Sequence, residues 1–571
     1  GYFSLLNSDR FRIGSAVEVR LGRGGPSESL IRGEVTSVEM EARPNGDTLL
    51  AVRGYDRAHR LHRERRTRTF VQVFDADVVR AIARESGLTP EVDEVGAAGP
   101  LHEHLFQDNQ TDWELLRARA ADLGCEVGVR DQRLFFRRPV TGGEPPEHAL
   151  FGSLLKIRLR MSAPAQVSEV VVRGWDPQRK QAIVGLATRA SDYIQPAIGE
   201  IRTGAEVAQP FGAGRYVVTA HNVSTQDEAQ KLAQAVYDEI AGEFIQLEGA
   251  CLGDPRVRAG QPIRLTNLGQ RFSGTYYVTA VTHRMTPDEG YVTHFTVSGR
   301  QPITMAALLA GGSGNGSAGA VHRGFQGLGQ TTGRYGGVVS AVVTNNKPTD
   351  ARYAGQVKVK FPWLSDSEES RWARIAAPSA GSDRGFFFLP EINDEVLVAF
   401  EHGDINRPYV VGGLWNGKDL PPRDARAIVA TDGRVKQRVI KSRTGHTVIL
   451  DDSDETPGIT IVDRTEKNKI TLDSKSNVMT IAAEGDLHIA ARGTVRLTGR
   501  ALAFEATAED AIITGRNATL EARSGAVTAR GVRANIEATA GKATVKGAAG
   551  ADVEAAAGIL TLKGGPLVNI N

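Results

Sequence analysis

Three short stretches of the sequence carry side chains that can bind metals or phosphates. The first is His102-Glu103-His104, where an extended strand would place both imidazoles on one side and offer two ligands to a metal. The simpler interpretation is a surface loop, and we favour it. The second is Asp451-Asp452-Ser453-Asp454-Glu455, whose clustered carboxylates could bind calcium. It lacks the glycine and the final glutamate of a calcium loop, so we interpret it as a solvated turn before Pro457-Gly458.

The third stretch, Gly314-Asn315-Gly316-Ser317-Ala318-Gly319, matches the dinucleotide fingerprint G-x-G-x-x-G. That fingerprint works between a strand and a helix, and here neither element flanks it. We interpret it as part of a linker. Serine, cysteine and histidine residues are scattered without the pattern of a nucleophile elbow. We predict no catalytic residue, no cofactor and no metal, although a triad assembled in space stays open.

The composition narrows the class of protein. With 571 residues the chain should form three or four domains, and a net charge of +2 gives no reason to expect nucleic acid as a partner. Two cysteines, Cys125 and Cys251, cannot build a disulfide framework, which suits a reducing cytoplasm. No apolar run approaches the ~20 residues that span a bilayer. The chain opens at Gly1 without a methionine, so a targeting segment stays possible.

Residues 1–305 alternate strand-like runs with helices. Alternating apolar residues predict strands at 16–21, 30–35 and 133–136. A helix is expected at 77–84, ended by Gly87 in a left-handed cap. Thr111 lies three residues before Glu114, the spacing of a capping box. A further helix should cover 226–241, opened by Ser224 or Thr225.

Residues 306–337 are rich in glycine and serine and predict a linker. Residues 338–425 predict a compact β module, with strands at 337–343, 356–361 and 395–400 and turn signals between them. A small barrel of five or six strands, of the oligonucleotide/oligosaccharide-binding (OB) type, suits this length.

Residues 426–571 change character again. From Ala482 onward the only aromatic residue is Phe504, so an ordinary core is not expected. Apolar pairs recur every seven to nine residues with glycines between them, and each unit is too small to bury its own face. Such short steps favour three chains wound together into a triangular β prism. We expect its core to include Leu487, Ile489, Val495, Leu497, Leu502, Phe504, Leu520, Val545, Leu560 and Leu562.

Several motifs carry a family resemblance. The stretch from Gln107 to Leu116 resembles the tail-hub motif of VgrG proteins and phage late-control proteins, and 273–283 resembles closing strands of that hub. The run from Gly385 to Val398 is similar to the barrel signature of the family, followed by 403–408 and 412–416. Residues 444–452 resemble the start of the needle. The order of hub, barrel and needle carries most of the resemblance.

The resemblance implies a mainly β chain: a hub of two tube-like β barrels with a few helices, an OB-fold barrel, and an intertwined triple-stranded β-helix at the C-terminus. It implies a structural spike and not an enzyme. The homotrimer would cap a hexameric inner tube, contact baseplate and hub proteins, and pierce a target envelope. A PAAR-repeat tip protein would bind Leu567, Val568, Asn569, Ile570 and Asn571. Effector cargo is a further expected partner, and nucleic acid is not.

Two details refine this expectation. About 25 residues separate Asn416 from Thr444, too few for the lysozyme domain that some phage spikes carry there. The short format favours a phage-like injection particle over a type VI system, assembled in the bacterial cytoplasm and then released or delivered to the target surface. Some phage tips hold iron with a His-x-His pair at the needle apex. His102 and His104 fall in the hub, so that role does not carry over.

Two other classes of protein compete with this interpretation. A trimeric tailspike or polysaccharide-degrading enzyme would need acidic grooves and aromatic sugar platforms on the needle, where aromatics are nearly absent. A trimeric surface adhesin would need a secretory signal and a membrane anchor, and neither is visible. The barrel signature fits neither of them.

Overall fold

The computed structural model describes residues 8–563, except 24–26, 43, 45–47, 94–98, 141, 177, 192–196, 199–202, 213, 219–222, 299–334, 529, 532, 534, 541–542 and 562. The chain forms two compact units, Gly1–Val435 (unit 1) and Lys436–Asn571 (unit 2). The expected linker lies almost wholly outside the described residues, and so do Leu562 and the five expected tip residues. No described helix is long and apolar enough to cross a bilayer.

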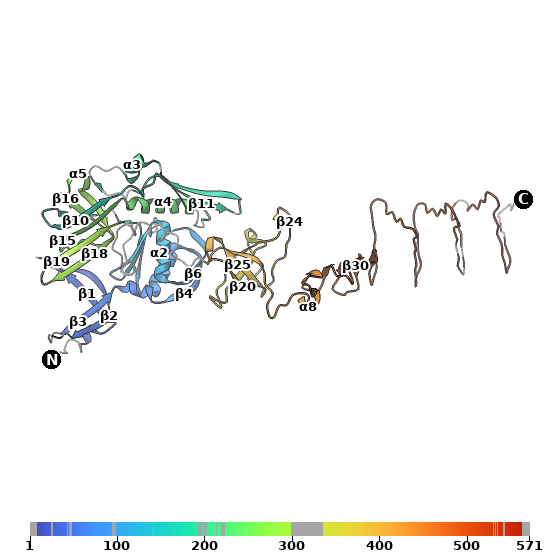
Figure 1. The fold of residues 1–571 in the computed structure, drawn as a ribbon, viewed down its shortest axis with the longest axis horizontal. Coiled ribbons are helices and arrows are strands. Elements are labelled where there is room, and N and C mark those ends of the chain that lie inside the picture. The colour runs from blue at the N-terminus through green and yellow to red at the C-terminus, as the bar shows by residue number, and fades with distance from the viewer. Residues whose placement is uncertain are drawn as a thin grey trace. The chain divides into compact units, whose positions relative to one another are not determined.

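Unit 1 begins with a three-stranded antiparallel sheet in the order β1-β2-β3 (Figure 1). The alternation that predicted the first strand brings Val19 opposite Ile31 in this sheet. The second strand extends well past the expected 30–35. The elements are the 3-10 helix η1 (Asp9–Phe11), β1 (Ala16–Leu21), β2 (Glu28–Ala42) and β3 (Thr48–Tyr55).

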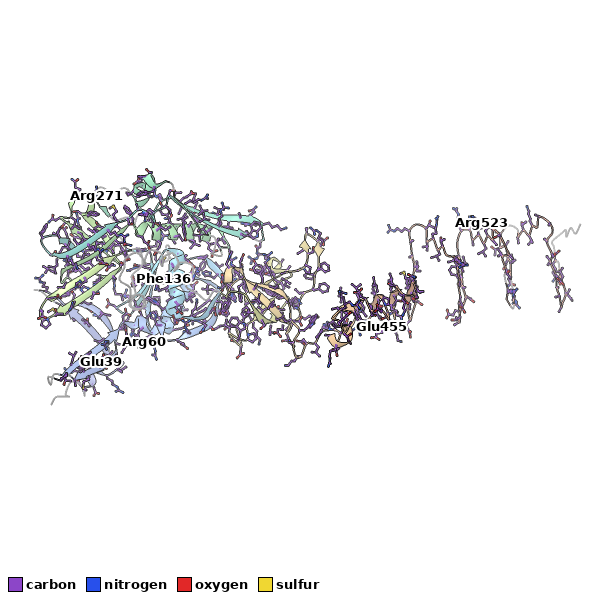
Figure 2. All side chains as sticks on the ribbon, in the orientation of Figure 1. Glu39, Arg60, Phe136, Arg271, Glu455 and Arg523 are labelled. Carbon is purple, nitrogen blue, oxygen red and sulfur yellow. The ribbon has the colours of Figure 1, made fainter. Side chains whose placement is uncertain are left out.

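We call residues 1–305 the hub. Two helices and five strands form its first core. Helices α1 and α2 pack over β5, β7 and β8, and Phe136 at the centre is fully buried (Figure 2). Strands β4 and β6 pair beside this core. The elements are η2 (Arg57–His62), β4 (Arg65–Phe74), α1 (Asp75–Glu85), β5 (Thr89–Val92), β6 (Leu101–Thr111), α2 (Asp112–Leu123), β7 (Glu126–Arg130) and β8 (Arg133–Arg137).

The helix ends follow the sequence signals. The Thr111 hydroxyl accepts from the Glu114 amide at 3.1 Å, and the Glu114 carboxylate accepts from the Thr111 amide at 2.9 Å. This confirms the predicted capping box. Gly87 follows α1 with a φ of +68°, which glycine adopts without strain. Helix α4 is capped by Thr225.

The second half of the hub contains two further cores. Sheets β10-β15-β19-β18 and β13-β17-β16-β9 enclose one, and α4 covers β11 and β12 to make the other. The elements are β9 (Glu147–Ala149), β10 (Leu154–Met161), β11 (Glu169–Asp176), β12 (Gln181–Ala187), β13 (Ala197–Ile198), α3 (Gly204–Ala208), η3 (Gln209–Phe211), β14 (Arg215–Val218), α4 (Gln226–Gly242), β15 (Ile245–Leu252), β16 (Gln261–Thr266), α5 (Gly269–Phe272), β17 (Gly274–Val278), β18 (Ala280–Thr286) and β19 (Gly290–Val297).

The remainder of unit 1 is a small barrel. Its sheet runs β21-β20-β25-β26-β22, and bridges from Val357 to Ala373 and from Lys360 to Glu369 connect its two ends. Alternating residues of β25, such as Val396 and Val398, fill its core. The elements are β20 (Val338–Asn345), η4 (Ala351–Tyr353), β21 (Lys358–Lys360), β22 (Arg374–Ile375), β23 (Ala380–Gly381), β24 (Arg384–Gly385), β25 (Glu395–Phe400), η5 (Glu401–Gly403), β26 (Pro408–Gly413) and α8 (Ala425–Ile428).

Unit 2 opens with a five-stranded antiparallel meander in which each strand pairs with the next. Its strands are β27 (Gln437–Lys441), β28 (Thr447–Asp451), β29 (Gly458–Val462), β30 (Lys469–Asp473) and β31 (Val478–Ala482). The chain turns between Asp451 and Gly458, where the solvated turn was predicted. Beyond Ala482 the described residues contain no strand, and Figure 1 draws them without arrows.

One expectation needs correction. His102-Glu103-His104 lies inside β6 and is partly buried, so it is not a surface loop. The short strands expected after residue 482 were predicted to be shared between three chains, and the described residues there have no strand pairing within the chain. A strand requires a hydrogen-bonded neighbour, so this prediction depends on other copies of the chain.

Candidate functional site

The meander of unit 2 has one almost entirely aliphatic face, which we call the apolar face. Strand register aligns Ile440, Val448, Ile461, Ile470 and Ile481 in one row across five strands. It aligns Leu450, Ile459, Leu472 and Met479 in a second row. Because side chains alternate across a strand, both rows project from the same side of the sheet.

No described residue of unit 2 covers this face. Ile440, Leu450, Ile459, Ile461, Leu472, Met479 and Ile481 remain between 39% and 62% exposed. Burying the rest of each side chain would stabilise an assembly by about 1 kcal/mol per residue. A contiguous apolar surface on a single layer of sheet is typical of an interaction site.

The opposite face is more polar. One of its rows contains Thr460, Thr471 and Thr480 side by side. Asp451, Asp463 and Asp473 lie at strand ends, and each carboxylate accepts hydrogen bonds from amides of the following turn. Hydrogen bonds from Thr465 and Asn468 lower the pKa of Asp463 to about 2. Hydrogen bonds within each turn thus fix the turns, while no described residue of unit 2 covers the apolar face.

The predicted needle residues continue the spacing of this face. The pairs Ile470/Leu472 and Met479/Ile481 belong to the apolar face, and Leu487/Ile489 and Val495/Leu497 repeat their i, i+2 pattern. Leu487, Ile489, Val495, Leu497, Leu502, Phe504, Leu520, Val545 and Leu560 are all between 49% and 78% exposed in the chain. The structure does not bring them together, so their shared core stays a prediction.

Within unit 1, strand β6 joins the hub to the barrel. Leu105 packs in the hub core, whereas Phe106 is 5% exposed and packs in the barrel core. The Phe106 amide donates to Asn406 Oδ1 at 2.8 Å. The Tyr335 hydroxyl donates to Asp108 Oδ1 at 2.8 Å. Alternation from 105 to 108 therefore gives Leu105 and Gln107 to the hub and Phe106 and Asp108 to the barrel.

The histidine pair belongs to this joint. His104 Nε2 lies 2.9 Å from the Glu369 carbonyl oxygen of the barrel. Burial lowers the pKa of His104, and the nearby charges of Lys358 and Arg371 lower it further. His102 turns the other way, with Nε2 3.0 Å from the buried Asp75 carboxylate. The two imidazoles thus serve different domains and do not form a two-ligand arm.

Glu103, between the two histidines, forms ion pairs with arginines of the barrel. Its carboxylate pairs with Arg352 and Arg371, both at 3.1 Å, and accepts from the Tyr353 hydroxyl. Burial alone would raise the pKa of Glu103, but the Tyr353 hydrogen bond and the two arginines hold it below its ordinary value. Sequence reasoning missed this joint because its partners lie roughly 250 residues apart and leave no local pattern.

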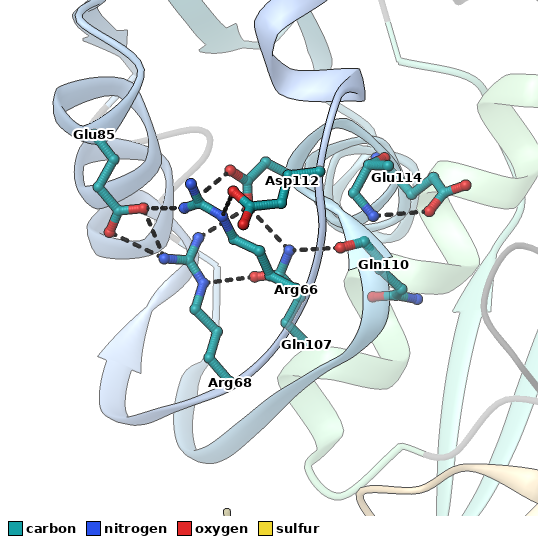
Figure 3. A network of polar contacts seen from close by, with 9 residues as sticks. Arg66, Arg68, Glu85, Gln107, Gln110, Asp112 and Glu114 are labelled. Carbon is teal, nitrogen blue, oxygen red and sulfur yellow. Dashed lines mark hydrogen bonds and ion pairs between the residues drawn. The ribbon is translucent and has the colours of Figure 1, made fainter. Parts of the chain in front are cut away.

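A buried polar network holds β6 on the hub side (Figure 3). The fully buried Gln107 accepts from Arg68 Nε at 2.7 Å and donates to Asp112 at 2.9 Å. Arg68 also pairs with Glu85 of α1 at 2.7 Å. The network connects β4, α1, β6 and the start of α2, and satisfied buried networks of this kind fix one packing geometry.

The hub also brings a serine, a histidine and an aspartate together. Ser153 Oγ lies 2.9 Å from His148 Nδ1, and Asp254 Oδ2 lies 3.4 Å from His148 Nε2. Asp254 is held by Arg256 at 2.7 Å, and His148 is 3% exposed. In a catalytic triad Nε2 faces the serine and Nδ1 faces the aspartate, whereas His148 uses the two nitrogens the other way round. Burial also raises the pKa of the nearby Cys251 thiol to about 12. We interpret the group as a structural contact that holds β9 against the loop after β15.

A cleft of about 920 Å³ opens between the hub and the barrel. It is lined by polar side chains of both, including Arg119, Glu228, Arg374 and Asp404. Among the described residues no group of three or more His, Cys, Asp or Glu side chains is placed to hold a metal. The two surfaces with a clear physical role are therefore the apolar face and the β6 joint.

Family models match two parts of the chain. The Alg8 N-terminal domain matches residues 1–287, about half of the chain. The type VI secretion system/phage-baseplate injector OB domain matches residues 339–415, which confirms the OB prediction for the barrel.

Curated relatives match the chain over shorter stretches. The type VI secretion system spike protein VgrG1a of Pseudomonas aeruginosa is 35% identical over 94 residues, 16% of this chain and 14% of the relative. VgrG3 of Vibrio cholerae is 36% identical over 72 residues, 12% of this chain and 7% of the relative. The chain thus matches only a small part of the length of these relatives.

Two solved structures are similar at low identity. A type VI secretion component of E. coli has a TM-score of 0.42 and 14% identity, covering 70% of this chain and 87% of that one. The Francisella PdpA-VgrG complex has a TM-score of 0.44 and 8% identity, covering 80% and 76%. The two family models cover most of the hub and the barrel. The chain belongs to the family of the Alg8 N-terminal domain and is a VgrG-type hub and spike protein.

Proposed function

We propose that the chain is the structural, non-enzymatic spike of a contractile injection system and that it works as a homotrimer. The observation that carries the proposal is the apolar face of the meander. Seven of its side chains are between 39% and 62% exposed in the single chain. Three copies would bury these faces against one another and form a triangular prism. The gain would be about 7 kcal/mol per chain, before the cost of association.

The residues after Ala482 extend this argument. They repeat the apolar spacing but have no strand pairing within the described part of the chain. Pairing between chains would satisfy their backbone groups and bury Leu487, Leu497 and the later members of the series. In this proposal the meander is the self-folding base of the needle, and the remainder folds only in the assembly.

The finer parts of the function rest on the family. In our proposal the hub caps a hexameric inner tube and contacts baseplate proteins, and the needle carries a PAAR-repeat tip at Leu567–Asn571. The trimer would pierce a target envelope and deliver effector cargo. The particle would be assembled in the bacterial cytoplasm and then act outside the producing cell. The β6 joint supports this role, since the packing of Phe106 in the barrel core and the ion pair of Glu103 with Arg371 let force pass between hub and barrel.

Two matched substitutions on one strand test the trimer. Ile461→Asp would place a carboxylate on the apolar face, and Thr460→Asp would place the same group on the opposite face of β29. An unpaired charge buried in an assembly costs several kcal/mol per chain. Light scattering should therefore give the mass of one chain for Ile461→Asp and of three for Thr460→Asp. Equal masses for the two variants would show that the apolar face does not hold the copies together.

A further inference from the structure

One edge strand of the hub lacks the charges, prolines and bulges that usually protect a sheet edge. Strand β12 lies at the end of the sheet β12-β11-β14, and it pairs with β11 along its whole length without a bulge. Its seven residues include no charged residue and no proline. Ile183 is buried in the core, but Val184 and Leu186 are 41% and 46% exposed. A flat, uncharged and partly apolar edge of this kind is a template for a strand of another chain.

Strand β10 shows the protection that β12 lacks. It also lies at the edge of its sheet, β10-β15-β19-β18, and it carries Lys156, Arg158 and Arg160 at alternate positions. Cations placed along an edge oppose the addition of another strand. Because β12 has no such charges, whatever closes its edge must come from another element.

Helix α4 supplies that element. It packs against β11 and β12 (Figure 1), and Gly185 lets it lie close, because a Cβ there would be 2.1 Å from the Ala229 carbonyl oxygen. Four residues of a helix rise about 6 Å and two residues of a strand about 6.7 Å, so side chains spaced four apart on α4 can follow alternate residues of β12. We call four such residues the α4 stripe: Gln226, Gln230, Gln234 and Asp238.

The first two members of the stripe bind the backbone of β12 as a strand would. Gln226 accepts from the Val184 amide at 3.4 Å and donates to the Val184 carbonyl at 2.5 Å. Gln230 accepts from the Leu186 amide at 3.1 Å and donates to the Leu186 carbonyl at 2.7 Å. Each carboxamide thus satisfies both backbone groups of one residue, the same pair of bonds that a neighbouring strand would make.

The other two members continue the series past the end of β12. Gln234 donates to the Arg189 carbonyl at 3.0 Å and to Asp238 at 2.9 Å. The fully buried Asp238 accepts from the Ser191 amide and from the Ser191 hydroxyl, both at 2.8 Å. The stripe is therefore anchored at its buried end and lies along the edge at its exposed end.

We infer that the α4 stripe masks a latent docking edge: it occupies the backbone groups of β12 that would otherwise pair with β12 of a second copy. Two identical uncharged strands can pair antiparallel about a twofold axis with no like charges to oppose them. Such a contact is separate from the apolar face of unit 2 and does not depend on the proposed trimer. Chains whose hubs paired in this way would join assemblies two by two, and the stripe prevents this.

Removing the first two carboxamides of the stripe tests the inference on the full chain. Gln226→Met/Gln230→Met keeps the length of both exposed side chains and the helix propensity, but it abolishes their four hydrogen bonds to β12. We expect hydrogen exchange in residues 182–187 to accelerate roughly tenfold. Light scattering at high concentration should give at least twice the mass of the unchanged protein, whatever that mass is. The control Lys231→Met, on the same helix, removes only an ion pair with Asp227 and should change neither.

A third substitution shows whether the new association uses β12. Val184→Lys, added to the double variant, places a cation on the opened edge and should restore the original mass. A double variant that keeps the original mass at every soluble concentration overturns the inference, even if its exchange is faster. A doubled mass that Val184→Lys does not reverse also overturns it, because the association then uses another surface.

Discussion

The β6 joint makes a sharp prediction about Phe106. This side chain belongs to a hub strand, yet it is 5% exposed inside the barrel core. Replacing a buried phenylalanine by alanine costs about 3–5 kcal/mol. Because the cavity would open in the barrel, the loss should fall on the barrel and much less on the hub. At ~1.4 kcal/mol per tenfold change, amide protection in β20 and β25 should fall by roughly 10²- to 4 × 10³-fold.

Hydrogen exchange measured by mass spectrometry follows each domain separately. Phe136→Ala is the matched control, because Phe136 is fully buried in the hub core and should cost a similar amount there. A gentler variant, Asn406→Ala, removes the acceptor of the Phe106 amide and should cost about 1–3 kcal/mol at the same joint. The reasoning is wrong if Phe106→Ala loosens α1 and α2 as much as the barrel strands, or leaves the barrel unchanged.

Three further predictions follow from single residues. Leu497→Asp should abolish the trimeric needle by burying an unpaired charge; an intact trimer of unchanged thermal stability would refute the needle core. Burial, with the negative charge of Glu239 nearby, raises the pKa of Glu243 to about 7. The folded state therefore loses stability as pH rises from 4.5 through 7, because the carboxyl group must ionise in a buried site. Glu243→Gln removes this cost, so it should raise the free energy of unfolding of unit 1 by about 1 kcal/mol at pH 8, after allowing for solvent screening. At pH 4 the substitution should have no effect. The pKa of His104 is lowered from 6.5, so its contribution is intact above pH 6.5 and is lost as pH falls below it. Urea unfolding should show that the free energy of unfolding falls less between pH 7.5 and pH 5 in His104→Gln than in the unchanged protein.

Local signals in the sequence predicted much of the hub and barrel. The reciprocal bonds of Thr111 and Glu114, the cap at Gly87 and the alternation in β25 all depend on neighbours a few residues apart. The OB barrel was predicted from the strand pattern and length of residues 338–425 and from the resemblance of the run 385–398, and the match to residues 339–415 confirms it. These features are short-range, so a single sequence contains them.

Long-range contacts escaped prediction. Nothing around His102-Glu103-His104 indicates that its three side chains bind Asp75, Arg371 and the Glu369 carbonyl. The exposure of Phe386–Phe388 could not be predicted either, because a phenylalanine run looks like a buried strand until its surroundings are known. The needle is a third case: its pattern indicates a shared core, but the partner strands belong to other copies.

The mass of the chain in solution tests the central claim most directly. Light scattering should give three chains of 61.3 kDa for the full protein and a single chain, or a weakly associating one, when the protein ends at Val435. That result would place the association in unit 2, where the apolar face lies. A stable full-length monomer would contradict the trimeric needle and with it the proposed spike.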